Sequence, residues 1–275
     1  MREPTIGIAG CGSMGLPMAK QLLAARQNVW GYDIRPTKEF GDFQSRMISD
    51  PAEFGTKVDI LISVVRNHQQ TLELCFDDQA LFTLPNHPKT FVCSSTLSPR
   101  VLPDISDRLP QDVAMVDAAM SGAPARAEDG TLTFMVGGEL GVVECLTPLF
   151  EIMGTEVNHL GFMGSGMTCK VINNFVAITG VAAVRKAIAA AIALGMNPKT
   201  LLDIMKSSSG STWYGDNIDQ ISWSREGYDP GNTIGIIEKD MLSFLDAVTS
   251  NPDVEVKDFA ASVLEVVRSM EPLDF

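Results

Sequence analysis

A lysine and an amide stand four residues apart near the start of the most helix-like part of the sequence. Lys170 and Asn174 follow Gly164 and Gly166, and a helical apolar pattern continues to about Leu194. Side chains at positions i and i+4 point from the same face of a helix. A lysine and an amide that project together beside glycines could form the wall of an active site. The alternative is a solvated lysine and an ordinary amide on a structural helix.

The helix that would position this pair is unusually long. From residue 164 to residue 194 it would extend roughly 40 Å at about 1.5 Å per residue, enough to run from one domain into another. Its most apolar part, Val176–Leu194, contains Arg185 and Lys186. These two charges favour a buried helix over a membrane span.

A glycine-rich turn stands near the beginning of the chain. It contains Gly10, Gly12, Ser13, Met14 and Gly15. A predicted strand, Thr5–Ala9, precedes the turn, a predicted helix follows to about Ala25, and a second strand covers residues 28–32. This context is what a dinucleotide-binding turn requires: the glycines permit a tight turn, close backbone approach to a pyrophosphate and close helix–strand packing. The helix N-terminus adds positive potential.

The second strand is followed by Asp33, and Arg35 stands two residues further on. A carboxylate at this place hydrogen-bonds the ribose 2′-hydroxyl of NAD and repels the 2′-phosphate of NADP. An arginine could instead bind that phosphate. The sequence therefore favours NAD as cofactor and leaves NADP possible.

Further strands follow at the spacing of an α/β protein, at residues 59–65, 90–93, 114–117 and 133–136. Ligands of such sheets bind beyond the carboxyl ends of the strands. The polar segments Ser94–Thr96 and Ser121–Gly122 stand at two of those ends, and we predict that they are site loops. Each taken singly could equally be ordinary turn chemistry.

Strand signals end at about residue 161. Helical patterns follow at residues 198–206, 213–222, 232–248 and 253–270. We therefore predict an α/β Rossmann domain over residues 1–161 and an all-α domain for substrate binding and oligomerisation over residues 162–275, joined by the long interdomain helix. A short helical domain buries little of its apolar surface, so we expect a homodimer or homotetramer.

Composition limits the classes of partner. The 21 lysines and arginines against 34 aspartates and glutamates give a net charge of −13, which argues against nucleic acid and anionic membranes. Five scattered cysteines without a CxxC pair and three histidines indicate reduced thiols and no metal site. The N-terminal residues do not read as a signal peptide. These features predict a cytoplasmic protein.

Several motifs occur together in an order that a known family shares. They are Gly10-x-Gly12-x-Met14-Gly15, Ser95-Thr96-x-x-Pro99, Asp117-x-x-x-Ser121-Gly122, Met135-Val136-Gly137-Gly138, Gly164-x-Gly166-x-x-x-Lys170-x-x-x-Asn174 and Lys239-Asp240. The chain thereby resembles the β-hydroxyacid dehydrogenases, which include 3-hydroxyisobutyrate, tartronate semialdehyde, L-threonate and 6-phosphogluconate dehydrogenases. The Ser94–Pro99 loop and the segment that begins at Val64 and Val65 look nearest to the L-threonate dehydrogenase branch.

The resemblance implies roles for individual residues. Lys170 matches the catalytic lysine, and Ser121, Gly122 and Asn174 match substrate-binding residues. The residues that match cofactor-binding positions are Gly10, Gly12, Ser13, Met14, Gly15, Asp33, Arg35, Val64, Val65, Thr96 and Lys239. Three positions depart from the family pattern: Cys93 stands for a frequent aspartate, Ala123 for a usual glycine, and Asn232 for a frequent phenylalanine, where it would make the substrate pocket more polar.

The implied reaction is hydride transfer between a nicotinamide cofactor and a small 3-hydroxy acid, of the 3-hydroxyisobutyrate, L-threonate or tartronate semialdehyde type. Lys170 would exchange the hydroxyl proton as general acid and base. A free lysine has a pKa of about 10.4, so burial or the charge of Lys239 would have to lower that pKa. The alternatives are an imine reductase-like enzyme, a Schiff-base lysine and a non-catalytic cofactor-binding sensor.

Overall fold

The computed structural model describes residues 3–249, 251 and 253–275 of the chain. The chain divides into two compact units, Met1–Lys170 and Val171–Phe275. The division falls inside one continuous helix, α7 (Ser165–Ala193), which therefore begins in the first unit and ends in the second.

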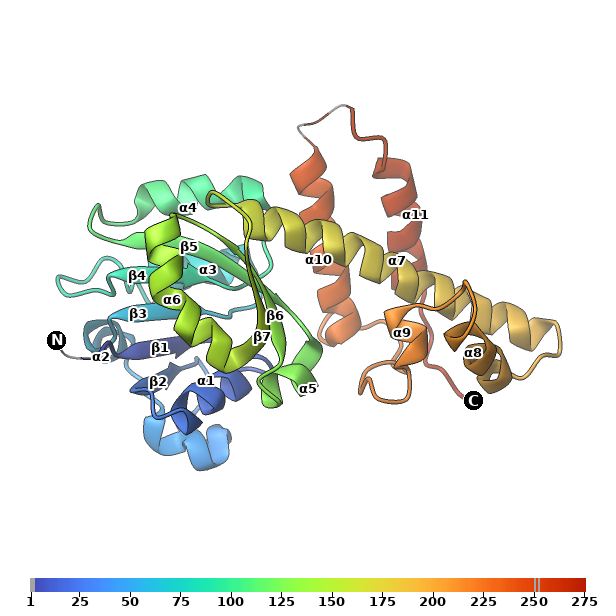
Figure 1. The fold of residues 1–275 in the computed structure, drawn as a ribbon, viewed down its shortest axis with the longest axis horizontal. Coiled ribbons are helices and arrows are strands. Elements are labelled where there is room, and N and C mark those ends of the chain that lie inside the picture. The colour runs from blue at the N-terminus through green and yellow to red at the C-terminus, as the bar shows by residue number, and fades with distance from the viewer. Residues whose placement is uncertain (1–2, 250, 252) are drawn as a thin grey trace. The chain divides into compact units, whose positions relative to one another are not determined.

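The first unit is built on a seven-stranded sheet (Figure 1). Its strands are β1 (Ile6–Ala9), β2 (Val29–Tyr32), β3 (Ile60–Ser63), β4 (Thr90–Cys93), β5 (Ala114–Ser121), β6 (Leu132–Gly137) and β7 (Gly154–His159). They lie in the order β2-β1-β3-β4-β5-β6-β7. Only the β5–β6 pair is antiparallel among the strands of this sheet.

Helices cover both faces of the sheet (Figure 1). They are α1 (Gly15–Ala24), α2 (Pro51–Lys57), α3 (His68–Cys75), α4 (Leu102–Arg108), α5 (Ala123–Glu128) and α6 (Leu140–Met153), with 3₁₀ segments at Thr37–Arg46 and Pro99–Val101. Neighbouring strand residues point to opposite faces. Phe91 thus joins the core under α2, α3 and α4, whereas Val92 joins the core under α1, α5 and α6. Burial on both sides explains the continuous apolar runs of these strands. The predicted Rossmann fold is confirmed.

The sheet differs from the prediction in two places. β5 does not end at Asp117 but continues to Ser121, so Ser121 is the last residue of a strand rather than part of a loop. β7 was not predicted, because its sequence, GTEVNH, is mostly polar. It is a largely exposed edge strand that pairs with β6, which accounts for the weak apolar signal.

The second unit is helical. It contains most of α7, with α8 (Pro198–Lys206), α9 (Trp213–Asp216), α10 (Thr233–Val248) and α11 (Lys257–Arg268). Its described residues include no strand, which confirms the predicted all-α region. The helix predicted over residues 213–222 is wrong in length, because α9 ends at Asp216. The core is formed by one apolar stripe of each of the longer helices, with Val184, Ile188, Met241, Phe244 and Val263 among its residues.

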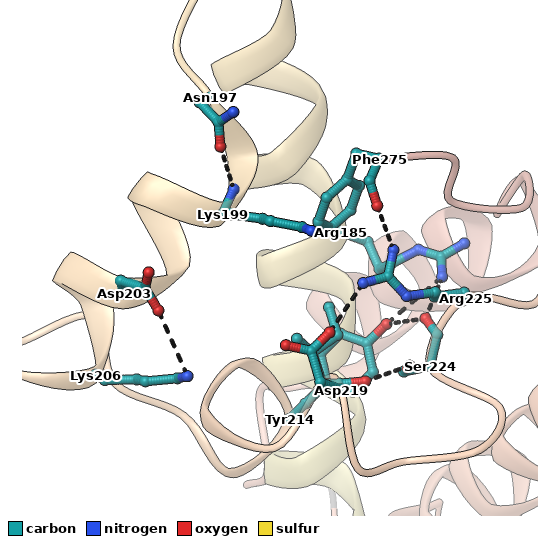
Figure 2. Close-up of polar contacts among 11 residues, drawn as sticks. Arg185, Asn197, Lys199, Asp203, Lys206, Tyr214, Asp219, Ser224, Arg225 and Phe275 are labelled. Carbon is teal, nitrogen blue, oxygen red and sulfur yellow. Dashed lines mark hydrogen bonds and ion pairs between the residues drawn. The ribbon is translucent and has the colours of Figure 1, made fainter.

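By length and apolar composition α7 could cross a membrane, and 39% of its most apolar window is buried in the protein. Its Arg185, only 6% exposed, is used inside the second unit. The guanidinium donates to the carbonyl oxygen of Ser224 at 2.8 Å (Figure 2). It also donates to the carbonyl oxygens of Glu226, at 3.0 Å, and of Glu271. The arginine thus fastens two chain segments to α7, as expected of a core helix.

Candidate functional site

The sheet aligns the predicted site segments of the first unit. Pairing places Ala9, Ser63, Cys93 and Asp117 side by side on four neighbouring strands. The glycine turn begins one residue beyond Ala9, and the Ser94–Thr96 segment one residue beyond Cys93. β1 lies between β2 and β3, so the chain leaves it in opposite directions, which is where open α/β sheets bind their ligands.

Glycine stands at positions 10, 12 and 15 of the turn for different structural reasons. Gly10 has a φ of +89°, and a Cβ there would lie 2.8 Å from the carbonyl of Val64 and 2.9 Å from the amide nitrogen of Val65. Gly15 packs against the carbonyl of Gly10 with no room for a Cβ. Gly12 is exposed, and a Cβ there would meet no atom within 4 Å among the described residues. Internal packing therefore does not require Gly12, whereas close approach of a pyrophosphate would.

Three buried hydroxyls lie at the carboxyl ends of β3 and β4. Ser63, Ser94 and Ser95 are each at most 4% exposed, and their Oγ atoms have no hydrogen-bond partner among the described residues. A buried hydroxyl without a partner costs about 1–3 kcal/mol. Their clustering at this edge, together with the open space at Gly12, fits a polar ligand such as a dinucleotide there.

Asp33 and Arg35 are joined to each other. Arg35 donates from Nε to Oδ1 of Asp33 at 3.0 Å and from Nη2 to Oδ2 at 3.1 Å, and Nη2 also reaches the carbonyl of Cys11 at 2.9 Å. The Asp33 carboxylate raises the pKa of Arg35. The guanidinium lies 4.9 Å from the centre of the Phe40 ring. Both residues proposed to read the cofactor ribose thus form one bidentate pair beside the glycine turn.

Cys93 belongs to the row of paired strand residues Ala9, Ser63, Cys93 and Asp117, where it lies beside Asp117. Burial, with a further contribution from the Asp117 charge, raises the pKa of the Cys93 thiol to about 12. The thiol therefore stays neutral near pH 7. A carboxylate in place of the Cys93 thiol would stand directly opposite Asp117 in the strand pairing.

The Ser121–Gly122 segment follows the extension of β5. Ser121 pairs with Thr133 of β6, four residues beyond Asp117, so at about 3.3 Å per residue it projects about 13 Å past the row. Gly122 has a φ of +146° and Ala123 a φ of +58°. The latter value is unfavourable for a residue with a side chain. Glycine adopts such a φ without this cost, so Ala123 carries local backbone strain.

Asp117 connects the sheet to the start of α7. Its Oδ1 accepts the Gly164 amide at 2.6 Å and its Oδ2 the Met167 amide at 2.7 Å. Burial raises the pKa of Asp117, against a lowering by these backbone hydrogen bonds. Lys170 follows Met167 by one helical turn and is 8% exposed. The predicted lysine is therefore a buried residue on the first turns of a fixed helix.

Asn174 and Lys239 belong to the second unit, where an acid connects them. Asn174 donates from Nδ2 to Oδ2 of Asp240 at 2.7 Å, and Lys239 Nζ lies 2.7 Å from Oδ1 of the same carboxylate. Asp240 had no predicted role, although it completes the Lys239-Asp240 motif. The available signal was its position next to a predicted site lysine.

The predicted effect of Asn232 on a substrate pocket finds no support in its contacts. Asn232 caps α10: its Oδ1 accepts the amides of Ile234 at 2.9 Å and Gly235 at 3.2 Å. Its Nδ2 donates to the carbonyl of Gly227 at 2.8 Å. The whole amide group is used to start the helix, because helix N-termini need such acceptors.

Comparison with known proteins covers nearly the whole chain. Residues 5–161 match the family model described as the NAD-binding domain of 6-phosphogluconate dehydrogenase. Residues 164–270 match the model described as NAD-binding of NADP-dependent 3-hydroxyisobutyrate dehydrogenase.

Individual proteins agree with these models. L-threonate dehydrogenase of Cupriavidus necator is 31% identical, with 88% of this chain and 82% of that protein aligned. NAD-dependent L-serine dehydrogenase of Pseudomonas aeruginosa is 35% identical over 76% of this chain and 71% of its own length. The crystal structure of 3-hydroxyisobutyrate dehydrogenase from Salmonella typhimurium superposes with a TM-score of 0.82 at 25% identity, covering 96% of this chain and 92% of that one. The chain belongs to the 3-hydroxyisobutyrate dehydrogenase-like β-hydroxyacid dehydrogenases, the NAD(P)-dependent oxidoreductases that act on the CH–OH group of hydroxy acids.

Proposed function

We propose that this enzyme oxidises the alcohol of a small 3-hydroxy acid to a carbonyl, reversibly, with Lys170 as general base in oxidation and general acid in reduction. The observation that carries the assignment is the place of Lys170: a buried amine just after the turn of α7 that Asp117 holds. Burial disfavours the charged form of an amine. A lysine can act as a general base only in its neutral form.

The cofactor would lie along the carboxyl edge of the sheet. The glycine turn, with Gly12, Ser13 and Met14 at its exposed side, would hold the pyrophosphate. Val64 and Val65, which close against Gly10, and Thr96 beyond β4 would line the same edge. Lys239 is assigned to the cofactor by the family resemblance. A bound nicotinamide supplies the hydride acceptor, and the protein moves the hydroxyl proton.

The substrate would carry a carboxylate near its alcohol. Ser121 and Gly122 would bind that carboxylate through a hydroxyl and a backbone amide, and Asn174 would orient the alcohol. The relatives named for L-threonate, L-serine and 3-hydroxyisobutyrate all act on acids with a hydroxyl on the β-carbon or with several hydroxyls. Their shared chemistry supports this class for the present chain.

The test is a panel of 3-hydroxyisobutyrate, L-threonate, L-serine and tartronate semialdehyde, each with NAD or NADP in the appropriate redox state, followed by reduced-cofactor absorbance. Turnover of at least one member is expected. A cyclic imine included in the panel addresses the imine reductase-like alternative. Cofactor binding without any turnover would instead favour a non-catalytic sensor.

The Schiff-base reading of Lys170 predicts a covalent adduct. Borohydride added with the carbonyl form of the substrate would trap that adduct as a stable mass increase on the Lys170 peptide. The acid–base role predicts no increase at this peptide.

The second unit supports association with further copies of the chain. Large apolar side chains are exposed along α7, at Ile172, Val176 and Ile192. Packing of such faces between subunits would bury them, which supports a homodimer or homotetramer. A single monomer boundary in sedimentation at micromolar concentration would contradict it. The five free cysteines support a cytoplasmic location, which microscopy of a tagged chain would check.

A further inference from the structure

We infer that Asp117 is a positioning residue for the reaction: its carboxylate, together with Gly137 and Gly166, holds the first turn of α7 on the sheet and thereby sets the place of Lys170. This inference rests on the proposed role of Lys170. The proposed reaction gives no role to the three sequence motifs around Asp117, Gly137 and Gly166, and this inference gives them a common one.

The Asp117 side chain is fully used by α7. It is 0% exposed, and its two oxygens accept the amides of Gly164 and Met167. The first amides of a helix have no partner inside the helix, so an acceptor here determines where the helix starts. A carboxylate also complements the positive end of the helix dipole.

The same geometry argues against a catalytic role for Asp117 itself. A group that exchanges protons with substrate must reach it, whereas both Asp117 oxygens face backbone amides and no solvent. The acid therefore acts through the helix that it holds.

Two glycines allow the helix to come this close. A Cβ on Gly137 would lie 2.5 Å from Oδ1 of Asp117 and 2.9 Å from the amide nitrogen of Ser165. A Cβ on Gly166 would meet the backbone of Met135 and lie 2.9 Å from Oδ2 of Asp117. The backbone of α7 thus lies directly on β6, and neither contact can absorb an added methyl group without moving the helix.

Met167 anchors the same turn from the apolar side. Its side chain is fully buried in the core that contains Phe91, Cys93 and Leu102. Polar bonds and core packing therefore fix one turn of α7 from two sides. Lys170 lies three residues further along this rigid helix, so a tilt or rotation at the first turn would displace its amine.

Asp117→Asn tests the inference. An amide has one acceptor oxygen where the carboxylate has two, so either the Gly164 amide or the Met167 amide would face a donor. We expect kcat to fall about 10- to 100-fold, since displacement of a catalytic group by about 1 Å has effects of that size. The kcat–pH profile should also shift, while the dissociation constant of NADH stays unchanged.

The matched control is Asp59→Asn. Asp59 accepts the Thr5 amide at 2.7 Å at the amino end of β3, so Asp59→Asn makes the same carboxylate-to-amide change at the opposite end of the strands from α7. Its kcat and pH profile should equal those of the wild type. Equal kcat in Asp117→Asn and Asp59→Asn would overturn the inference, because a merely structural acid would behave alike at both places.

A second pair of variants tests the same inference if Asp117→Asn does not fold. Gly166→Ala adds a methyl group at the contact with β6, whereas Gly180→Ala adds one further along α7, where the nearest atoms are 3.9 Å away. We expect only Gly166→Ala to lower kcat and shift the profile. Wild-type kcat in a folded Gly166→Ala protein would overturn the inference.

Lys170→Met separates this inference from the proposed function. Full activity in Lys170→Met would overturn both. Loss of activity in Lys170→Met with wild-type kcat in the Asp117 and Gly166 variants would overturn only the positioning role.

Discussion

The side-chain amide of Asn174 donates to the carboxylate of Asp240 at 2.7 Å, which ties α7 to α10 within the helical unit. The other carboxylate oxygen pairs with Lys239 at 2.7 Å. Because an amide nitrogen donates and its oxygen accepts, this bond leaves Oδ1 as the hydrogen-bond acceptor of the Asn174 side chain, and Oδ1 also accepts from Nδ2 of Asn173 at 3.4 Å.

Replacement of Asp240 by Asn should therefore weaken substrate binding. The Asn174 amide would lose its charged acceptor, and its side chain could flip. KM for the hydroxy acid should therefore rise about 10-fold, which corresponds to the loss of a charge-assisted hydrogen bond of about 1.5 kcal/mol. Steady-state kinetics measures this. Asp203→Asn, which removes an exposed carboxylate next to Lys206, is the control and should leave KM unchanged.

Lys170→Met should abolish turnover and keep cofactor binding, since the change removes the proposed acid and base while the glycine turn stays intact. The loss should be about 100-fold or more. Steady-state assays measure turnover, and fluorescence titration with NADH measures cofactor binding. Lys186→Met removes an exposed lysine of the same helix and should remain active. Near-normal turnover of Lys170→Met would refute the assignment.

Arg35→Ala should strengthen the preference for NAD. The carboxylate of Asp33 would lose its bidentate partner and repel a 2′-phosphate more strongly. We expect the ratio of kcat/KM for NAD over NADP to rise about 10-fold, equivalent to about 1.4 kcal/mol. Asp33→Asn should lower the same ratio. A ratio that is unchanged in both variants would exclude this pair as the selector.

Thiol reactivity should follow exposure and pKa. Burial raises the pKa of Cys11 and of Cys93 to about 12, so neither forms the reactive thiolate near neutral pH. Cys145 is exposed and should be alkylated first. Peptide mass spectrometry after brief iodoacetamide treatment at pH 8 checks the order. Labelling of Cys93 before Cys145 in the native protein would contradict it.

Arg185→Met should destabilise the helical unit strongly. Methionine fills a similar volume but leaves the carbonyls of Glu226 and Glu271 without their donor, at about 1–3 kcal/mol for each, whereas the Ser224 carbonyl keeps the Tyr214 hydroxyl. Denaturant unfolding should show a loss of about 3 kcal/mol or more. Lys206→Met, which removes only the exposed pair with Asp203 (Figure 2), should change stability by less than about 1 kcal/mol.

The sequence predicted the architecture where apolar periodicity is strong. β4 was predicted at its observed residues, and α8 likewise, because a doubly buried strand and a capped amphipathic helix leave clear patterns. β7 was missed because an edge strand in water needs few apolar residues. The end of β5 was misplaced because Ser121 looks like a turn residue, although pairing with β6 keeps it extended.

The candidate site was predicted less completely than the fold. Glycine spacing located the cofactor turn, and helix spacing paired Lys170 with Asn174. The bonds of Asp117 and of Asp240 could not be predicted, because each joins segments at least 47 residues apart in the chain. The bidentate pair of Asp33 and Arg35 was not predicted either, because the sequence suggests the two side chains as alternative contacts of the cofactor ribose and not as partners of each other.

The extension of β5 bears on the entropy of substrate binding. Ser121 is the last residue of a strand that a ladder to β6 already holds, so its backbone freedom is lost during folding and not when a ligand arrives. A comparable serine in a flexible loop would have to be ordered at about 1–2 kcal/mol per residue. As carboxylate ligand, Ser121 would therefore bind from a preorganised state, and substrate affinity would be sensitive to changes in β6, far from any contact with the substrate.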